Sequence, residues 1–381
     1  MERKYKMKVL YIFRKCPVSI GQGGVIMPPY FLSNRNGYQV VTIAPECDNN
    51  NEVTFQFPDN VCTYHYNKDI NHFRKVQFIM NILKREKPDI VHVFIAKSYY
   101  WLPVFISLFK FGKKEEAWLL DIQSPAISQK KKAKWRSLIK PIKQIGYDAV
   151  CTLNRASALS HLGHIFKPVF IVRLGYSPEI SCKKLSKKNT EVKPVKFLYM
   201  GAISKARKLE GLLESILILK EKYHITNVIQ FDFYGNGDYV NELVDFVKQK
   251  KLINIVKYKG VLSYENIIVK MKDYDVGFSY LPINTFYNKS PVSKTIEYIA
   301  AGLYVIASNT WANREIIVHG KNGLLTDNDP EQLAQVINDL ITKGISSKYI
   351  LNSGDLLKEY SWEHIVQSQY IPMYKSILEH T

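Results

Sequence analysis

The chain has few cysteines, and none stands in a pattern that binds a metal ion. Its five cysteines are scattered through 381 residues, with no CxxC pair and no zinc-ligand spacing. The sequence also has no signal-peptide pattern, so we expect a reducing cytoplasm. The most apolar stretch, residues 99–111, is too short to span a bilayer and contains Pro103. It predicts either a buried helix or a patch that faces a membrane.

The motifs of several binding classes are missing as well. No zinc finger and no aromatic RNA-binding motif is present, so we expect no nucleic-acid partner. No predicted strand leads into GxGxxG with an acidic residue about twenty positions later, which places an NAD-type oxidoreductase last among the candidate functions. The chain carries 53 Lys and Arg against 34 Asp and Glu, a net charge of +19. An anionic partner is therefore expected, either nucleotide phosphates or an acidic membrane surface.

One basic cluster interrupts an otherwise even spread of charge. Residues 130–143, KKKAKWRSLIKPIK, hold seven basic residues and no acid. Trp135, Leu138, Ile139 and Ile142 are spaced to share one helix face. Such a segment can lie on anionic lipid, which predicts peripheral contact with the inner membrane face. The alternative is an ordinary surface helix whose apolar side packs into the core.

Short apolar runs alternate with longer mixed segments in both halves of the chain. Strands are expected at 9–13, 38–44, 90–94, 118–122 and 149–153, and the pattern restarts at 196–200. This alternation predicts an α/β fold with two Rossmann-like, doubly wound domains facing each other across a cleft. We expect an N-terminal domain at 1–182, a lysine-rich linker at 183–195 and a C-terminal domain at 196–364. A final helix at 365–381 can pack back on the first domain.

The stretch 290–308, SPVSKTIEYIAAGLYVIAS, carries the strongest chemical signal. Lys294 and Glu297 are three residues apart and share a helix face, and Ser293 or Pro291 can begin that helix. A helix N-terminus beside a lysine binds anions, and a carboxylate on the same face can accept hydrogen bonds from sugar hydroxyls. Phosphate and ribose together describe a nucleotide-sugar site. The alternative is a solvated first turn with a weak surface pair.

Six motifs in this order resemble the GT-B glycosyltransferases, in particular the retaining class called family 4 or glycosyl transferases group 1. They are GQGG at 21–24, PDIVHV at 88–93, YMGAISKARKLEGLLES at 199–215, FYGNGDY at 233–239, SKTIEYIAAGLYVIAS at 293–308 and NREIIVHGKNGLL at 313–325. The last but one is similar to the family signature KxxEYxAxGxPVIAS. The resemblance covers almost the whole chain.

The resemblance implies a hexosyltransferase-type enzyme that moves a sugar from a UDP- or GDP-linked donor, with retention and without a metal or other cofactor. The acceptor would be lipid-linked or a polysaccharide, in the synthesis of cell-surface glycans. No clear DxD site for Mg²⁺ or Mn²⁺ is present. Protein cations and a helix N-terminus would then stabilise the leaving diphosphate.

Site residues follow from the same resemblance. Arg207, Lys294 and Glu297 are expected to act in catalysis, the two cations on the diphosphate and Glu297 on the ribose. Donor contacts are expected from the residues Gly23, Gly24, Lys208, Gly235, Gly237, Ser290 and Ser293. Lys205 is an alternative to Lys208. For the cations the plain alternative is a basic surface, and for the glycines it is a set of tight turns.

Three positions depart from the family pattern. Lys289 stands where the family has its first glutamate, Leu120 and Asp121 stand where it has a histidine, and Tyr304 replaces the usual proline. Asp121 is the candidate on the acceptor side, whereas His92 lies inside an apolar strand and is expected in the core. The departures leave open a second hypothesis, a non-catalytic GT-B subunit that partners an active transferase.

Overall fold

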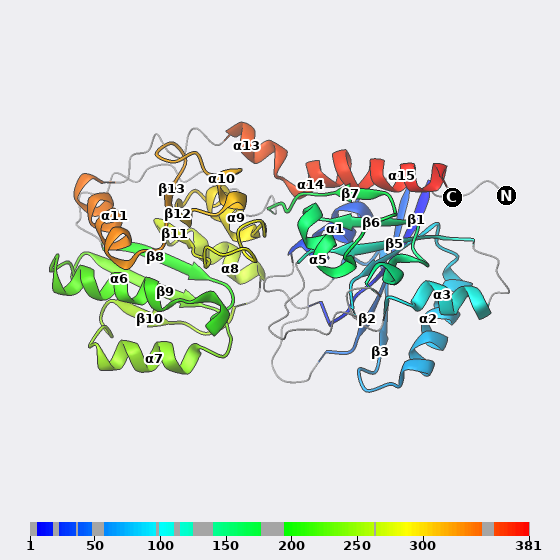
Figure 1. Ribbon diagram of the computed structural model, residues 1–381, viewed down its shortest axis with the longest axis horizontal. Helices are drawn as coiled ribbons and strands as arrows, with labels where there is room; N and C mark the ends of the chain where they lie inside the picture. The colour runs from blue at the N-terminus through cyan, green and yellow to red at the C-terminus, as the bar shows by residue number, and fades with distance from the viewer. Residues whose placement is uncertain are drawn as a thin grey trace. The chain divides into compact units, whose positions relative to one another are not determined.

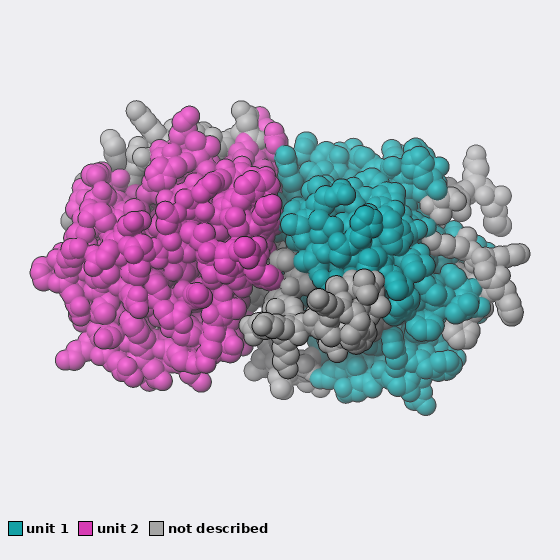
Figure 2. Space-filling view, viewed as in Figure 1, with its two compact units in different colours: residues 1–174, 362–381 teal, residues 175–361 magenta. Residues whose placement is uncertain are grey.

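The computed structural model describes residues 6–17, 23–35, 37–47, 57–96, 99–109, 115–124, 140–176, 194–262, 264–344 and 354–380. The chain forms two compact units, residues 1–174 with 362–381 and residues 175–361 (Figure 2). We call them unit 1 and unit 2. Most of the expected linker 183–195 lies outside the described residues.

Unit 1 is built on a parallel sheet of seven strands in the order β3-β2-β1-β4-β5-β6-β7. The strands β4 and β5 are buried along their whole length, as expected for a parallel sheet covered by helices on both faces. The strands are β1 (Met7–Ile12), β2 (Tyr38–Pro45), β3 (Val61–Tyr66), β4 (Ile90–Phe94), β5 (Ala117–Ile122), β6 (Ala149–Thr152) and β7 (Val169–Ile171) (Figure 1).

The helices of unit 1 follow from local sequence signals. The longest one begins after Asn71, whose side chain accepts a hydrogen bond from the Arg74 N–H, and ends at Lys87 in a left-handed conformation. Its apolar residues recur at helical spacing and are buried. The helices are α1 (Gly23–Ser33), α2 (His72–Glu86), α3 (Leu102–Phe109), the 3₁₀ turn η2 (Pro141–Gln144) and α5 (Arg155–Leu162).

The C-terminal helices belong to unit 1, although 187 residues of unit 2 separate them from the rest of it. They are α14 (Trp362–Ile365), a π-helical turn (Val366–Tyr370) and α15 (Ile371–Glu379), drawn in orange to red in Figure 1. Trp362, Tyr370 and Tyr374 are fully buried. The Tyr374 hydroxyl lies 2.7 Å from that of Tyr11 in β1, so this segment is part of the unit 1 core.

Cys16 and Cys47 are joined in a disulfide, which the scattered cysteine spacing did not predict. They follow β1 and β2, two neighbouring strands of the sheet, and their Cα atoms are 5.2 Å apart. Of the remaining cysteines, Cys62 is exposed and Cys151 is buried. The bond therefore links two loops at the carboxyl edge of the unit 1 sheet.

Unit 2 repeats the architecture with six parallel strands in the order β10-β9-β8-β11-β12-β13. Phe197, Phe231 and Phe278 stack at its centre, with ring centroids 4.4–5.9 Å apart. The strands are β8 (Val195–Met200), β9 (Ile229–Tyr234), β10 (Val256–Tyr258), β11 (Val276–Ser279), β12 (Tyr304–Ser308) and β13 (Leu324–Thr326). The helices are η4 (Lys205–Arg207), α6 (Glu210–Glu221), α7 (Val240–Gln249), α8 (Tyr264–Met271), α9 (Ser293–Ala300), α10 (Trp311–Arg314), α11 (Pro330–Lys343) and α13 (Gly354–Glu359).

The two parallel α/β sheets confirm the predicted fold class. In each sheet the strand order reverses once along the chain, between β1 and β4 in unit 1 and between β8 and β11 in unit 2. The GQGG motif, 21–24, suits a loop between a strand and a helix, but its last two residues, Gly23 and Gly24, form the first turn of α1. Ligands of open parallel sheets bind outside the carboxyl ends of the strands at such reversals, which directs attention to the loops that follow these four strands.

Candidate functional site

Two cations lie at the strand reversal of unit 2. The turn η4 follows β8 and carries Arg207, whereas α9 follows β11 and carries Lys294 and Glu297. The charges of Arg207 and Glu297 both act on Lys294, so the three side chains form one cluster. The structure thus brings together residues that come from two separate sequence motifs.

Lys294 is held in an aromatic setting. Its Nζ donates a hydrogen bond to the Tyr280 carbonyl at 3.3 Å and lies 4.4 Å from the centre of the Tyr199 ring. The residue is only 9% exposed. Burial lowers the pKa of Lys294 well below its usual value, and Arg207 lowers it further, while Glu297 opposes the shift. A negatively charged ligand would relieve this cost, because it favours the charged ammonium.

Arg207 has a buried donor that its surroundings do not satisfy. Its guanidinium carbon lies 5.0 Å from the centre of the Tyr287 ring, within the range of a cation–π contact. Within the described part of the chain, Nη1 is buried and has no hydrogen-bond partner. Buried polar groups without partners are costly and rare. A guanidinium with a spare N–H fits an anionic oxygen, such as one on a phosphate.

The N-terminus of α9 adds backbone donors to the same place. Val292 precedes the helix, and its side chain has no polar atom with which to cap the first turn. Ser293 is the first helical residue, and the Ser290 N–H donates to the Tyr287 carbonyl in the preceding turn. The first-turn N–H groups of an eight-residue helix therefore remain for an anion.

Polar side chains fix this helix against the strand ends. Thr295 Oγ1 lies 2.6 Å from Ser279 Oγ at the end of β11 and donates to Asn313 Oδ1 at 2.9 Å. One turn further, the Tyr298 hydroxyl accepts the Met200 N–H at the end of β8, at 2.9 Å. These groups are buried or partly buried, where satisfied hydrogen bonds hold geometry most firmly. The position of Lys294 is consequently set by both strands of the reversal.

Glu297 is more enclosed than the sequence interpretation implies. The residue is 3% exposed, so it presents at most a small edge to a ligand in this structure. Its carboxylate raises the pKa of Lys294 from one helical turn away. The placement therefore supports an electrostatic role beside the cations more directly than a contact with ribose.

Gly235 and Gly237 shape the loop that carries Arg207. Both have positive φ, +142° and +156°, and a Cβ on either would collide with the backbone of Gly201 or Ile203. The Gly201 N–H donates to the Tyr234 carbonyl at 3.0 Å, so the turn after β9 supports the loop after β8. The two glycines thus act through close backbone packing.

The remaining lysines of this loop, Lys205 and Lys208, are exposed. Lys205 Nζ forms an exposed ion pair with Glu242 at 2.7 Å, the kind of contact that adds little stability. Lys208 is exposed and has a left-handed backbone at φ 49°. Neither lysine contacts the cluster of Arg207 and Lys294 through any interaction recorded among the described residues.

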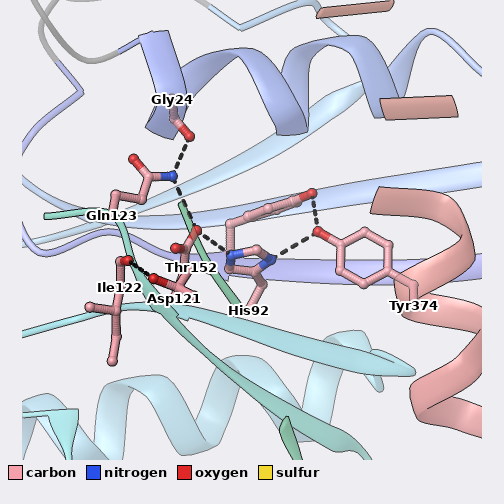
Figure 3. A network of polar contacts seen from close by, with 8 residues as sticks. Gly24, His92, Asp121, Ile122, Gln123, Thr152 and Tyr374 are labelled. Carbon is pink, nitrogen blue, oxygen red and sulfur yellow. Dashed lines mark hydrogen bonds and ion pairs between the residues drawn. The ribbon is translucent and has the colours of Figure 1, made fainter. Parts of the chain in front are cut away.

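Unit 1 has a buried polar chain at its own carboxyl edge (Figure 3). His92 Nε2 lies 2.9 Å from Asp121 Oδ2, and His92 Nδ1 lies 2.8 Å from the Tyr374 hydroxyl. His92 and Asp121 are both fully buried. The structure thus places His92 in the core, as expected. It also places Asp121 in the interior, where an acceptor hydroxyl cannot reach its carboxylate.

Gln123 connects that chain to the first turn of α1. Its Nε2 donates to the Gly24 carbonyl at 2.6 Å and to Asp121 Oδ2 at 3.1 Å. A Cβ on Gly24 would lie 2.7 Å from Leu174 and 2.8 Å from the Gln123 side chain, so a larger residue there would have to displace these side chains. Gln123 is a site residue that sequence reasoning missed. The sequence feature that could have identified Gln123 is a polar residue directly after a buried strand, and a polar residue near the end of the same strand pointed to Asp121.

Tyr199 and Tyr287 were missed for a different reason. Tyr199 begins the motif 199–215 and Tyr287 lies three residues before the stretch 290–308, but tyrosine has no specific pattern for holding a cation. Among the described residues, no group of three His, Cys, Asp or Glu side chains is arranged to bind a metal ion. Over the same ranges, no helix has the length and apolarity needed to cross a bilayer.

Comparisons with known proteins agree with this geometry. Residues 182–355 match the family Glycosyl transferases group 1. Spore coat protein SA of Bacillus subtilis (strain 168) is 26% identical over 182 residues, 45% of this chain and 46% of its own length. The chain therefore matches less than half of that relative.

Solved structures match over nearly the whole chain. Sucrose-phosphate synthase from Thermosynechococcus elongatus superposes with a TM-score of 0.73 at 15% identity, covering 99% of this chain and all of the other. Alr3699/HepE from Anabaena, solved in complex with UDP, gives 0.66 at 15% identity, covering 97% of this chain and all of the other. At these identities the likeness concerns the fold. Residues 182–355 thus match the Glycosyl transferases group 1 family, and the two parallel α/β units have the fold of the GT-B glycosyltransferases.

Proposed function

We propose that this protein is a retaining glycosyltransferase that uses a UDP- or GDP-linked sugar and needs no bound metal ion. The observation that carries the proposal is the unsatisfied Nη1 of Arg207 beside the buried ammonium of Lys294, at the N-terminus of α9. Three kinds of anion-binding donor meet there. The Anabaena relative was solved with UDP, which supports a nucleotide diphosphate as the ligand.

The chemistry follows from where charge develops. The bond between the anomeric carbon and the diphosphate oxygen breaks, and the bond to the acceptor oxygen forms on the same face of the sugar. Negative charge develops on the leaving diphosphate. Arg207 can make a bidentate contact with its oxygens, and Lys294 contributes a single positive charge. The acceptor hydroxyl gives its proton to a leaving phosphate oxygen. This chain then needs no separate base for that step.

The other donor contacts remain proposals of the same kind. Lys208, Ser290 and Ser293 would contact phosphate oxygens from the loops around Arg207 and the start of α9. Gly23 and Gly24 begin α1, where backbone N–H groups can approach an anion. Glu297 would stabilise Lys294 as a cation and contact the ribose through its exposed edge.

We propose a lipid-linked or polysaccharide acceptor, held at the inner membrane face. The net charge of +19 supports an anionic surface nearby. Of the basic segment 130–143, only residues 140–143 are among those described. The Bacillus relative is named as a spore coat protein, which supports a role in the assembly of a cell-surface material.

The proposal is tested by nucleotide binding without metal. Purified protein is titrated with UDP and GDP in the presence of EDTA, and donor sugars are then screened for release of the nucleotide diphosphate. Arg207→Gln should weaken binding about 10- to 150-fold, since a charge-assisted hydrogen bond contributes about 1.5–3 kcal/mol. Lys248→Gln, an exposed lysine on α7, is the matched control. Equal affinity in both variants would remove Arg207 from the site.

A second candidate function is a non-catalytic GT-B subunit. It is favoured by Lys289 at the position of the family's first glutamate and by the enclosure of Glu297. Such a subunit would bind UDP or GDP and release no product from any donor. Turnover that is lost in Glu297→Gln, with nucleotide binding kept, would reject this candidate.

A further inference from the structure

Exposed apolar side chains are frequent in one stretch of the unit 1 sequence. Among the described residues, sixteen large hydrophobic side chains are exposed, and eight of them lie between positions 101 and 171. Single exposed hydrophobic residues are normal on protein surfaces, whereas a group of them marks an interaction site. This region therefore needs an explanation that the nucleotide site does not provide.

The helix α3 shows the pattern most clearly. Leu102 and Ile106 face the core and are 1% exposed each, while Trp101, Phe105 and Leu108 are 41%, 43% and 70% exposed. The exposed positions are four and three residues apart, so they share one helix face. The sequence LPVFISLF contains no charged residue. A surface helix normally has a polar outer face, so this outer face is built to meet something apolar.

The turn η2 extends the same surface. Gly146 packs against Pro103 and Val104 so closely that a Cβ would lie 2.9–3.0 Å from them. Beside this contact, Ile142 and Ile145 are 37% and 53% exposed. The α3–η2 surface is therefore defined by Trp101, Phe105, Leu108, Ile142 and Ile145.

The edge of the α3–η2 surface is positively charged. Lys140 Nζ and Lys143 Nζ donate to the backbone carbonyls of Ser160 and His161, at 3.0 and 3.2 Å. These bonds position the two ammonium groups, and Lys143 Nζ also lies 4.7 Å from the centre of the Tyr100 ring. Burial lowers the pKa of His161, and the charges of Lys143 and Lys140 lower it further. The field on this side of unit 1 is therefore positive.

We propose that the α3–η2 surface docks on an anionic lipid bilayer, with its apolar side chains in the interface and its lysines among the headgroups. Apolar residues bordered by lysines are the composition that such binding requires. A second copy of the chain is a poorer occupant, because it would bring two surfaces of like charge together. The inference rests on the proposed function only for its purpose, which is to bring the active enzyme to a membrane-held acceptor.

The test is flotation of the full chain with vesicles of phosphatidylcholine alone and of phosphatidylcholine mixed with phosphatidylglycerol. Wild-type protein should float with the mixed vesicles and much less with the neutral ones, and added salt should weaken the binding. The double variant Phe105→Ser with Leu108→Ser should bind the mixed vesicles about tenfold less, because two apolar anchors are lost. The matched control is Ile253→Ser with Val269→Ser, which are 63% and 62% exposed in unit 2.

The outcomes separate this inference from the proposed function. UDP binding and the molar mass in solution are measured for every variant. If the double variant still binds UDP and floats like wild type, the docking surface is wrong while the nucleotide site stands. If the double variant floats like wild type but has lost a self-association that the wild-type mass shows, the partner is a second copy of the chain and the inference is again wrong. Loss of flotation with UDP binding kept and mass unchanged supports it.

Discussion

Replacing Lys294 by methionine should weaken nucleotide binding and at the same time stabilise the free protein. Methionine keeps the length and apolar stem of lysine, and it packs readily in irregular spaces. The charge disappears from a site that is 9% exposed and lies beside Arg207. We expect the UDP affinity to fall and the free energy of unfolding to rise, because a ligand needs the ammonium, whereas the folded protein without ligand is destabilised by it.

The two magnitudes can be set from the contacts. Losing one charge-assisted hydrogen bond to a phosphate costs about 1.5–3 kcal/mol, which is a UDP dissociation constant about 10- to 150-fold weaker. In the free protein, Lys294→Met loses one hydrogen bond of 3.3 Å and one cation–ring contact. It also removes a charge that the folded state disfavours on balance, because burial and Arg207 together outweigh Glu297, and each unit of lowered pKa corresponds to about 1.4 kcal/mol. We expect a net gain of about 1 kcal/mol at neutral pH.

The pH dependence of the free energy of unfolding tests the direction of this stability change independently. The folded state disfavours the charged lysine, so the cost is fully present below the lowered pKa and shrinks as the pH rises from there towards the unfolded value near 10.4. Denaturant unfolding of Lys294→Met, wild type and the exposed control Lys248→Met, with isothermal titration of UDP, measures both quantities. A variant that is less stable than wild type and binds UDP equally well would refute the reasoning.

Three further predictions concern the surrounding groups. The bound diphosphate should raise the pKa of Lys294, so UDP binding should take up a proton. The affinity for UDP should fall as the pH rises through the lowered pKa of the free protein. Calorimetry in buffers of different ionisation enthalpy measures the proton uptake. Tyr287→Leu should weaken UDP binding about two- to fivefold by releasing Arg207, with little change in unfolding free energy. Tyr374→Phe should destabilise unit 1 by about 1–3 kcal/mol, because His92 Nδ1 loses its partner, and thermal unfolding should show it while UDP binding is kept.

Much of the fold is predictable because buried parallel strands are nearly continuous apolar runs. Residues 90–94, for example, are a strand with the expected bounds. The short edge strands β7 and β13 have three residues each, too few to show a period. The strand β3, VCTYHY, alternates polar with apolar residues and was missed, because its position beside β2 makes it a strand more than its composition does.

The candidate site was predictable only in part. The order of motifs placed Arg207 and Lys294 after neighbouring strands, and a parallel sheet brings such loops together. The rings of Tyr199 and Tyr287 and the unsatisfied Nη1 depend on side-chain packing, which no local pattern specifies. Asp121 was read as a strand-end acid open to an acceptor. It is buried beside His92, whose other partner, Tyr374, lies 282 residues further along the chain.

The long return of the C-terminal segment affects how the protein is made. Unit 1 takes core residues from both ends of the sequence, with all of unit 2 synthesised in between. A ribosome therefore delivers unit 2 whole while the first Rossmann-like layer still lacks Trp362, Tyr370 and Tyr374. Domains usually mature in the order in which they are translated. In this chain the half that is begun first must be finished last.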